Sequence, residues 1–332
     1  MIKDILKKLF EYKKLSRSEA KEILIDIAAD KYNGSHVVAF LSVYMMRPIS
    51  VEELSGFRDA LLELCCKVDL SDFEAIDIVG TGGDGKNTFN ISTLSSFVVA
   101  GAGYKVTKHG NYGVSSASGS SNVMEYLGYK FSNEEDVLKR QTDKAGICFL
   151  HAPLFHPAMK AVAPYRKELG LKTFFNMLGP LVNPSFPNSQ LLGVYSLELA
   201  RLYQYLFQDT NKNYTIIHSL DGYDEISLTG DFKSITNEGE QLIAPEYLGF
   251  KRICQEDIFG GDTVPQAAQI FTNILDGKGT DAQNSTIFAN AAMAISCMDK
   301  SKSVEDAIAL AKDSLLSGRA KQTLKSLVAL SE

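Results

Sequence analysis

The sequence predicts an α/β fold in which a small N-terminal helical domain precedes a larger α/β domain with a mainly parallel central sheet. Residues 1 to about 70 have a helical pattern throughout, because apolar residues recur at helical spacing between capping signals. From about residue 75, short apolar runs alternate with segments of helical pattern. Such alternation is typical of a parallel sheet with crossover helices. The predicted strands are 75–79, 104–107, 147–150, 191–195 and 214–220.

These two patterns predict a domain boundary near residue 72. We expect residues 1–72 to form the helical domain, and residues 73–165 with 189–332 to form the α/β domain. The intervening stretch, 166–188, contains Pro180, Pro184 and Pro187. We expect this stretch to leave the sheet and return to the helical domain.

The helical domain begins with an amphipathic helix, since residues 2, 5, 6, 9 and 10 are apolar. The same residues do not have the pattern of a signal peptide. Ser16 and Glu19 predict the start of a second helix, and Ser50 with Glu53 predicts a capping box at the start of another. The apolar residues of this last helix are spaced for one buried face: Leu54, Phe57, Leu61 and Leu64.

A glycine-rich loop follows the first predicted strand. Four of the six residues from Gly80 to Gly85 are glycine, so backbone N–H groups can approach a ligand without Cβ clashes. The apolar, Ser-rich stretch 91–101 predicts a helix directly after the loop. A strand, such a loop and a helix in this order indicate a phosphate site. A tight strand-to-helix turn without a ligand is the alternative.

The loop fits two nucleotide-binding motifs only in part. Gly80, Gly82 and Gly85 satisfy the dinucleotide motif, but the second predicted strand ends in the basic pair Lys108 and His109 instead of an acid for a ribose hydroxyl. Residues 80–86 satisfy the nucleoside triphosphate motif, but Asn87 follows where that motif needs Ser or Thr for magnesium. Neither class of site is favoured.

Polar residues follow the predicted strands at their carboxyl ends, where parallel sheets bind ligands. Lys108 leads into a loop of small hydroxyl residues that suits an anion, with a flexible linker as the alternative. Asp224 and Glu225 follow the strand 214–220, and adjacent carboxylates suit magnesium, with a solvated acidic turn as the alternative. The glycine loop is followed by four polar residues that could bind phosphate or cap the next helix: Thr88, Asn90, Ser92 and Thr93.

Composition limits the possible partners. A chain of 332 residues with 45% hydrophobic and 22% charged residues is an ordinary globular protein with room for a sizeable core. Its net charge of −6 disfavours nucleic acid as the main partner, and it has no run of about eighteen apolar residues that predicts a membrane span. The cysteines and histidines lack metal-ligand spacing, so we expect reduced thiols and no zinc. A cytoplasmic protein is predicted.

Several separated motifs of this chain resemble those of the anthranilate phosphoribosyltransferases, in the same order and over nearly the whole length. The matching segments are 80–84, 88–93, 108–111, 156–160, 164–170, 176–184 and 221–227, with the C-terminal segments 290–292 and 307–318.

The resemblance implies a helical domain, a larger α/β domain, an active site between them and a homodimer formed through the helical domains. It implies transfer of phosphoribose from phosphoribosyl pyrophosphate to anthranilate, the second dedicated step of tryptophan biosynthesis, with Mg²⁺. No side chain is expected to act as a nucleophile, because positioning and electrostatic stabilisation carry the reaction. Lys108 and His109 would have supporting roles.

Site residues follow from the resemblance by position. Phosphoribosyl pyrophosphate would be held by Gly80, Gly83, Asp84, Thr88, Asn90, Ile91, Ser92, Thr93, Lys108, His109, Gly110, Asn111, Ser116 and Ser120. Anthranilate would be held by Gly80, Asn111, His156, Tyr165 and Arg166. Magnesium would be met by Ser92, Asp224 and Glu225.

The chain departs from the usual pattern of the family in the loop after Lys108. Tyr112 and Gly113 stand where a basic residue and a serine are usual, Ala117 where a lysine is common and Asn122 where an aspartate is common. The loop has therefore lost two positive charges, which bears on donor affinity.

Two other interpretations remain open. A pyrimidine nucleoside phosphorylase has a related fold and a similar Lys-His-Gly segment, but the paired acids Asp224 and Glu225 and the block 176–184 count against it. A non-enzymatic relative that binds nucleic acid is disfavoured by the net charge of −6 and by the intact magnesium positions.

Overall fold

The computed structural model describes residues 2–113 and 118–331, which form two compact units. The helical unit comprises Met1–Lys67 and Ala152–Pro184, and the α/β unit comprises Val68–His151 and Ser185–Glu332. The fold class predicted from the sequence is confirmed. The segment that returns to the helical unit begins at Ala152, because the helix that spans residue 166 packs on the N-terminal helices.

The helical unit contains six α-helices and two short 3-10 helices among its described residues. Capping boxes at Ser16–Glu19 and Ser50–Glu53 begin α2 and α4, as the sequence predicts. Helix α9 contains the expected boundary at residue 166 and contacts α2, α3 and α4. The elements are α1 (Ile2–Phe10), α2 (Arg17–Ala28), α3 (Gly34–Met46), α4 (Val51–Leu64), α8 (Ala152–Phe155), α9 (Pro157–Leu169), η1 (Phe174–Met177) and η2 (Gly179–Leu181).

Buried aromatic and polar contacts hold the returning segment to the N-terminal helices. Phe174 of η1 stacks on Phe57 of α4, with ring centroids 4.4 Å apart. Glu53 is fully buried, and its carboxylate accepts hydrogen bonds from the Leu15 N–H at 3.0 Å and from the Arg47 guanidinium. A buried carboxylate is tolerated only when paired in this way. The unit is therefore held by both apolar packing and a satisfied buried charge.

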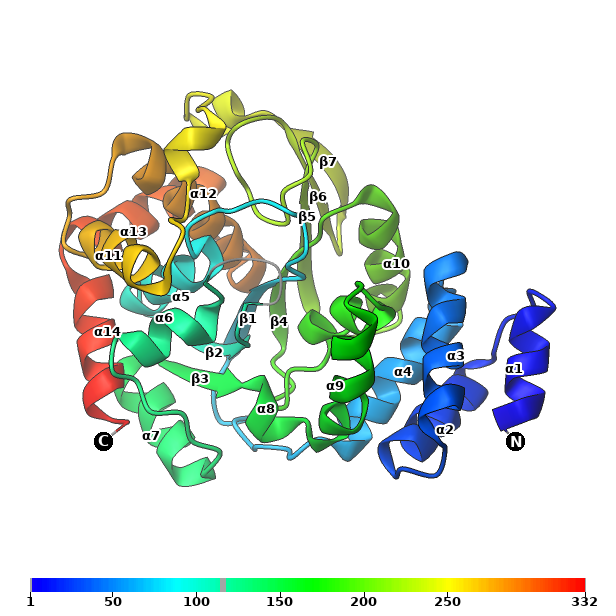
Figure 1. The fold of residues 1–332 in the computed structure, drawn as a ribbon. Helices are drawn as coiled ribbons and strands as arrows, with labels where there is room; N and C mark the ends of the chain where they lie inside the picture. The colour runs from blue at the N-terminus through cyan, green and yellow to red at the C-terminus, as the bar shows by residue number, and fades with distance from the viewer. Residues whose placement is uncertain (1, 114–117, 332) are drawn as a thin grey trace. The chain divides into compact units, whose positions relative to one another are not determined.

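The α/β unit is built on a seven-stranded sheet with the order β3-β2-β1-β4-β5-β6-β7 (Figure 1). The first five strands are parallel, whereas β6 and β7 form an antiparallel hairpin at one edge. The sequence predicts the five parallel strands to within about three residues. The strands are β1 (Ala75–Gly80), β2 (Lys105–Gly110), β3 (Ile147–His151), β4 (Ser189–Gly193), β5 (Asn213–Ser219), β6 (Phe232–Thr236) and β7 (Gly239–Ile243).

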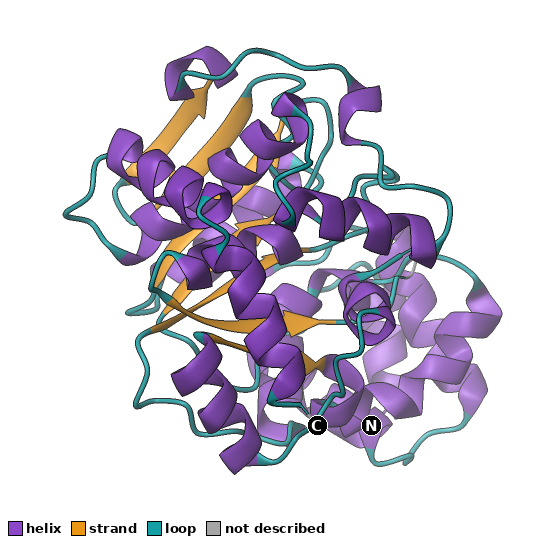
Figure 2. Cartoon of the chain, turned by 90° about the vertical axis from the view of Figure 1, so that its left-hand side faces the viewer, coloured by secondary structure: helices purple, strands orange, loops and turns teal. Residues whose placement is uncertain are grey.

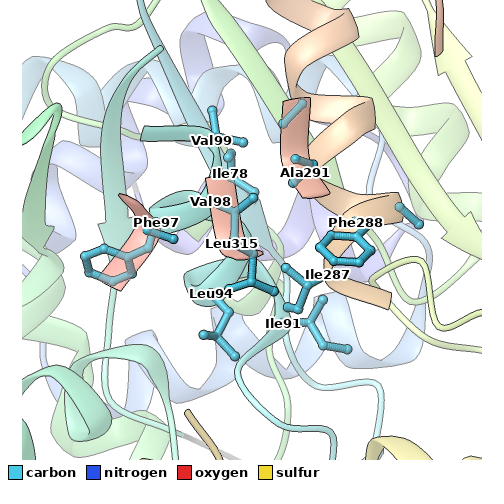
Figure 3. Packing of buried hydrophobic residues seen from close by; sticks show 14 of the residues in the cluster. Ile78, Ile91, Leu94, Phe97, Val98, Val99, Ile287, Phe288, Ala291 and Leu315 are labelled. Carbon is cyan, nitrogen blue, oxygen red and sulfur yellow. The ribbon is translucent and has the colours of Figure 1, made fainter. Parts of the chain in front are cut away.

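Helices cover the sheet (Figure 2). They bury its apolar side chains. Ile78 of β1 lies with Leu94 and Val98 of α5 and with Ile287 of α12 in one hydrophobic core (Figure 3). The helices are α5 (Ile91–Gly101), α6 (Ser120–Tyr126), α7 (Glu135–Ala145), α10 (Leu197–Gln208), α11 (Val264–Leu275), α12 (Asp281–Met298), α13 (Val304–Leu316) and α14 (Arg319–Ala329), with 3-10 helices η3 (Pro245–Leu248) and η4 (Gln255–Ile258).

Within the described part of the chain, no helix has the length and apolar character needed to cross a membrane.

Candidate active site

Glycines end two neighbouring strands at the point where an acidic loop crosses them. Gly80 of β1 and Gly193 of β4 are register partners. A Cβ at Gly80 would overlap the carboxylate of Asp224, and a Cβ at Gly193 would overlap the Asp224 carbonyl oxygen. Only glycine at both strand ends therefore lets the loop 221–227 lie directly on the sheet edge.

The glycine-rich loop after β1 is joined to this acidic loop by a hydrogen bond. The Gly82 N–H donates to Asp224 Oδ2 at 2.6 Å. Gly82, Gly83 and Gly85 all have positive φ angles, which residues with a Cβ rarely adopt. The Lys86 N–H donates to Asp84 Oδ1 at 3.0 Å and closes the loop locally.

Glu225 lies at the start of helix α5, which follows the glycine-rich loop. Its Oε1 accepts the Ser92 N–H at 2.9 Å, and its Oε2 accepts the Thr88 hydroxyl at 3.4 Å. A carboxylate at this end of a helix is favoured by the helix dipole. Asn290 of α12 fixes the other side of the acidic loop, because its amide binds both the N–H and the carbonyl of Ile226, at 3.1 and 2.8 Å.

Burial opposes the charges on the two acids. Burial, together with the negative charge of Asp84, raises the pKa of Asp224 to about 7. Burial and the charge of Asp224 also raise the pKa of Glu225 well above its usual value. Two such carboxylates side by side favour the arrival of a cation.

The polar groups around the N-terminus of α5 have roles that the sequence left open. Asn90 occupies the N-cap position of α5 without a side-chain capping bond. Its amide instead donates to the Ser118 carbonyl at 3.2 Å, so it joins the glycine-rich loop to the loop after β2. The Thr93 hydroxyl is buried and has no hydrogen-bond partner among residues 2–113 and 118–331.

Lys108 of β2 is almost completely buried, with 2% of its surface exposed. Its Nζ donates to the Ile78 carbonyl at 2.7 Å. Burial lowers the pKa of Lys108, while the negative charges of Asp77 and Glu225 oppose this shift. The sequence analysis missed Asp77, whose Oδ1 accepts the His109 N–H at 3.0 Å. The signal was present, since Asp77 is an acid inside an otherwise apolar strand.

The loop after β2 is fixed where it leaves the strand and where it enters α6. The Asn111 carbonyl accepts the Ser121 N–H at 3.1 Å and the Ser120 hydroxyl at 3.3 Å. Asn122 Oδ1 accepts the N–H groups of Gly113 and Gly119, at 2.9 and 3.0 Å. Ser116, predicted to bind the donor, lies outside the described residues, as does Ala117.

The other predicted site residues lie in the helical unit, on or beside α9. His156 is buried at the N-cap of α9, and burial lowers its pKa to about 4, so the imidazole is neutral at pH 7. Arg166 binds Asn176 Oδ1 at 3.4 Å and lies over the Phe175 ring. Tyr165 lies so close to Gly34 that a Cβ there would approach its ring to 2.7 Å.

Comparison with known proteins places the chain in a family. Residues 72–321 match the glycosyl transferase family, a/b domain, and residues 3–65 match its helical bundle domain. An anthranilate phosphoribosyltransferase of Flavobacterium johnsoniae is 61% identical over 99% of this chain and 100% of its own length. The relative in Christiangramia forsetii with the same name is 59% identical over the full length of both. This chain belongs to the anthranilate phosphoribosyltransferase family.

Solved structures agree with the family assignment. The anthranilate phosphoribosyltransferase of Thermus thermophilus has a TM-score of 0.91 at 31% identity and covers 98% of both chains. The Saccharomyces cerevisiae enzyme, described in complex with PRPP and Mg, has a TM-score of 0.91 at 28% identity, covering 99% of this chain and 97% of its own. The resemblance drawn from the motifs is thereby confirmed.

Tyr112, where the family usually has a basic residue, has defined contacts in this chain. Its hydroxyl donates to Glu125 at 3.3 Å, and its ring packs edge-on against the His151 ring with centroids 4.8 Å apart. His151 in turn stacks on Phe131 and binds the Ser121 hydroxyl at 2.9 Å. The phenol therefore replaces a cation with a hydrogen bond and an aromatic contact.

The acidic loop fits the magnesium ion that the family implies, provided that the substrate supplies further ligands. Among residues 2–113 and 118–331, no group of three or more His, Cys, Asp or Glu side chains could hold a metal. Mg²⁺ typically takes one or two carboxylates and completes its shell with water and substrate phosphates. The carboxylates of buried Asp224 and half-buried Glu225 match that requirement.

Proposed function

We propose that this chain transfers the phosphoribosyl group of phosphoribosyl pyrophosphate to the amino group of anthranilate, releasing pyrophosphate, in tryptophan biosynthesis. One arrangement carries the proposal, namely the glycine-rich loop and the start of α5 held against two adjacent acids by the Gly82–Asp224 and Ser92–Glu225 hydrogen bonds. A loop of backbone donors suits a diphosphate, and the acids suit its accompanying magnesium.

The donor residues that we propose surround the glycine-rich loop and the start of α5. The support is the backbone conformation at Gly82, Gly83 and Gly85 and the buried Thr93 hydroxyl, which a phosphate oxygen would satisfy. The set within the described residues is Gly80, Gly83, Asp84, Thr88, Asn90, Ile91, Ser92, Thr93, Lys108, His109, Gly110, Asn111 and Ser120.

Asp224 and Glu225, with Ser92, would hold Mg²⁺. The bound ion would stabilise the negative charge that develops on the pyrophosphate as its bond to C1 of the ribose breaks. Lys108 lies buried near Glu225 and adds positive potential to the same side of the site. No side chain forms a bond to the ribose in this scheme, because the amine of anthranilate attacks directly.

We propose that Arg166 binds the carboxylate of anthranilate. Its guanidinium contacts an amide oxygen and an aromatic ring, and no carboxylate lies within 4.0 Å of it among the described residues. Burial lowers the pKa of Arg166, as expected for a positive charge that lacks full compensation. His156, Tyr165, Gly80 and Asn111 complete the proposed acceptor set.

We also propose a cytoplasmic homodimer formed through the helical units. The helical unit exposes large apolar side chains, including Phe10 at 61%, Tyr12 at 74% and Met46 at 80% of their surface. Exposed apolar groups of this size favour an interface. Analytical ultracentrifugation tests the assembly: the wild type should sediment as a dimer, and a Met46→Lys variant should shift toward the monomer. Fractionation of cells would test the location.

A product assay tests the proposed activity. The protein is mixed with phosphoribosyl pyrophosphate, Mg²⁺ and anthranilate, and the fall in anthranilate fluorescence is followed together with release of pyrophosphate. Omission of either the donor or Mg²⁺ should stop the reaction. Phosphorolysis of pyrimidine nucleosides with inorganic phosphate, or a salt-dependent shift of nucleic acid, with no anthranilate consumption, would refute the proposal.

A further inference from the structure

Lys86 connects the glycine-rich loop to the acidic loop through its side chain. Its Nζ lies over the Tyr223 ring, 4.6 Å from the centroid. Its Cε lies 3.9 Å from the position that a Cβ on Gly222 would occupy. Since its own N–H is held by Asp84, both ends of the residue are fixed at the meeting point of the two loops.

The ammonium group of Lys86 has no acidic partner in an acidic neighbourhood. Asp221, Asp84 and Glu256 place negative charge near the Tyr223 ring. Yet among residues 2–113 and 118–331 no carboxylate oxygen lies within 4.0 Å of Lys86 Nζ. The side chain is half-buried and is held by an aromatic face, so its charge remains available to a ligand.

Lys86 differs in this respect from Lys108, the cation that the sequence motifs single out. Lys108 is almost completely buried, and its Nζ donates a hydrogen bond to the Ile78 carbonyl. Lys86 is instead half-buried, and its Nζ lies over the Tyr223 ring. A lysine ammonium on a flexible stem is a common phosphate ligand, since it acts as a mobile point charge.

We propose that Lys86 is a donor-binding residue whose ammonium group, oriented by the Tyr223 ring, binds the pyrophosphate moiety of phosphoribosyl pyrophosphate. The inference rests on the proposed function and deepens it. It supplies a cation beside the glycine-rich loop in a chain that has Tyr112 in place of a basic residue in the loop after β2. Because Lys86 contacts the leaving group before and during bond cleavage, it contributes mainly to binding.

Steady-state kinetics test the proposal with Lys86→Met, which keeps the length of the side chain and removes its charge. Lys312→Met is the matched control. Lys312 belongs to α13, and its Nζ also lies over an aromatic ring, 5.5 Å from the centroid of Phe250. At saturating anthranilate, Lys86→Met should raise the KM for the donor about tenfold with kcat within about twofold of wild type. Lys86→Arg should recover most of the loss, and Lys312→Met should match wild type.

Calorimetry with magnesium pyrophosphate as the probe separates this proposal from the proposed function. Lys86→Met should bind the probe about tenfold more weakly than wild type and Lys312→Met, with thermal unfolding unchanged. If the wild type consumes no anthranilate while Lys86→Met binds the probe about tenfold more weakly than the wild type, the function is refuted and the role of Lys86 in pyrophosphate binding is supported. Equal affinities and equal donor KM values in Lys86→Met and Lys312→Met would overturn the role of Lys86.

Discussion

Asp224 Oδ2 accepts the backbone N–H of Gly82 at 2.6 Å, which ties the loop after β5 to the loop after β1. The two residues are 142 positions apart in the sequence. They meet because β4 lies between β1 and β5 and ends in Gly193, over which the acidic loop can pass. The contact places a buried carboxylate beside the backbone N–H groups of the glycine-rich loop.

The paired variant Asp224→Asn with Glu225→Gln should lose activity without losing stability. The amides keep the size of the side chains and remove two charges whose pKa values burial raises in the fold. Since charged forms of such groups destabilise the native state, the metal-free variant should melt at the same temperature or higher. We expect kcat to fall by about a hundredfold or more, measured beside calorimetric unfolding. Wild-type rates at limiting Mg²⁺ would contradict the metal role.

The substitution Gly193→Ala should displace the acidic loop and lower kcat. The added Cβ would overlap the Asp224 carbonyl oxygen, so either the loop or the end of β4 must shift. Misplacement of a site by about 1 Å can cost about a hundredfold in rate. Gly230→Ala is the matched control, because its Cβ would be 3.7 Å from Asp221, an ordinary contact. Equal kcat values in the two variants would show that the loop tolerates the displacement.

The sequence predicted the fold well where the pattern was local. The five parallel strands and the two capping boxes could be found because strand periodicity and capping spacing are contained within a few residues. The hairpin β6–β7 was missed, since four of the five residues of β7 are exposed and the strand has no apolar run. Its pairing becomes visible only when β6 is placed beside β5.

The candidate site was predictable by residue type but not by contact. The glycine-rich loop and the acidic pair could be identified, whereas the bond between Gly82 and Asp224 required the strand order. Burial was also inaccessible from sequence, so the hydrogen bond from Lys108 to the Ile78 carbonyl could not be predicted. Lys86 entered the sequence analysis only as the lysine of an incomplete nucleoside triphosphate motif, because its contact with Tyr223 depends on the fold.

Stability should fall as the pH is lowered from about 6.5 to about 4, in part because of His156. Burial lowers the pKa of His156 to about 4, below the value near 6.5 in the unfolded chain. In this window the unfolded state binds the proton and the native state does not, so protonation favours unfolding. The contribution approaches about 3 kcal/mol at the acidic end.

Urea unfolding at pH 7 and pH 4.5 measures this effect. The variant His156→Gln should show a smaller loss of stability between the two pH values than wild type. The matched control is His36→Gln, since His36 is a half-buried histidine on α3 of the same unit. An unchanged pH dependence in His156→Gln would show that other groups dominate acid unfolding.

The variant Tyr112→Arg should tighten donor binding by restoring the cation that is usual at this position of the family. The new guanidinium would first meet Glu125, which now accepts the Tyr112 hydroxyl at 3.3 Å. The double variant Tyr112→Arg with Glu125→Gln leaves that charge unpaired and should lower the donor KM by up to about fivefold, since an exposed charge contact is worth about 1 kcal/mol or less. Tyr112→Phe is the control and should match wild type. A donor KM that does not fall would place this loop away from phosphate.

Removal of the Arg166 guanidinium should weaken acceptor binding specifically. Loss of one charge-assisted hydrogen bond is worth about 1.5–3 kcal/mol, so Arg166→Ala should raise the KM for anthranilate roughly ten- to a hundredfold. The KM for phosphoribosyl pyrophosphate should stay within about twofold. Arg58→Ala is the matched control, because Arg58 pairs with Asp59 at 3.1 Å on α4 and has no proposed ligand.

Lys108→Ala should weaken binding of the donor instead of the acceptor. It should raise the KM for the donor, and it should also lower the free energy of unfolding, because the Ile78 carbonyl loses its buried donor. Kinetics in which Arg166→Ala spares anthranilate and weakens the donor would assign Arg166 to the phosphate side. Arg166 has no carboxylate partner among the described residues, whereas Lys108 lies near Glu225 and keeps N–H donors beyond the one bound to the Ile78 carbonyl. We therefore expect the two variants to separate acceptor binding from donor binding.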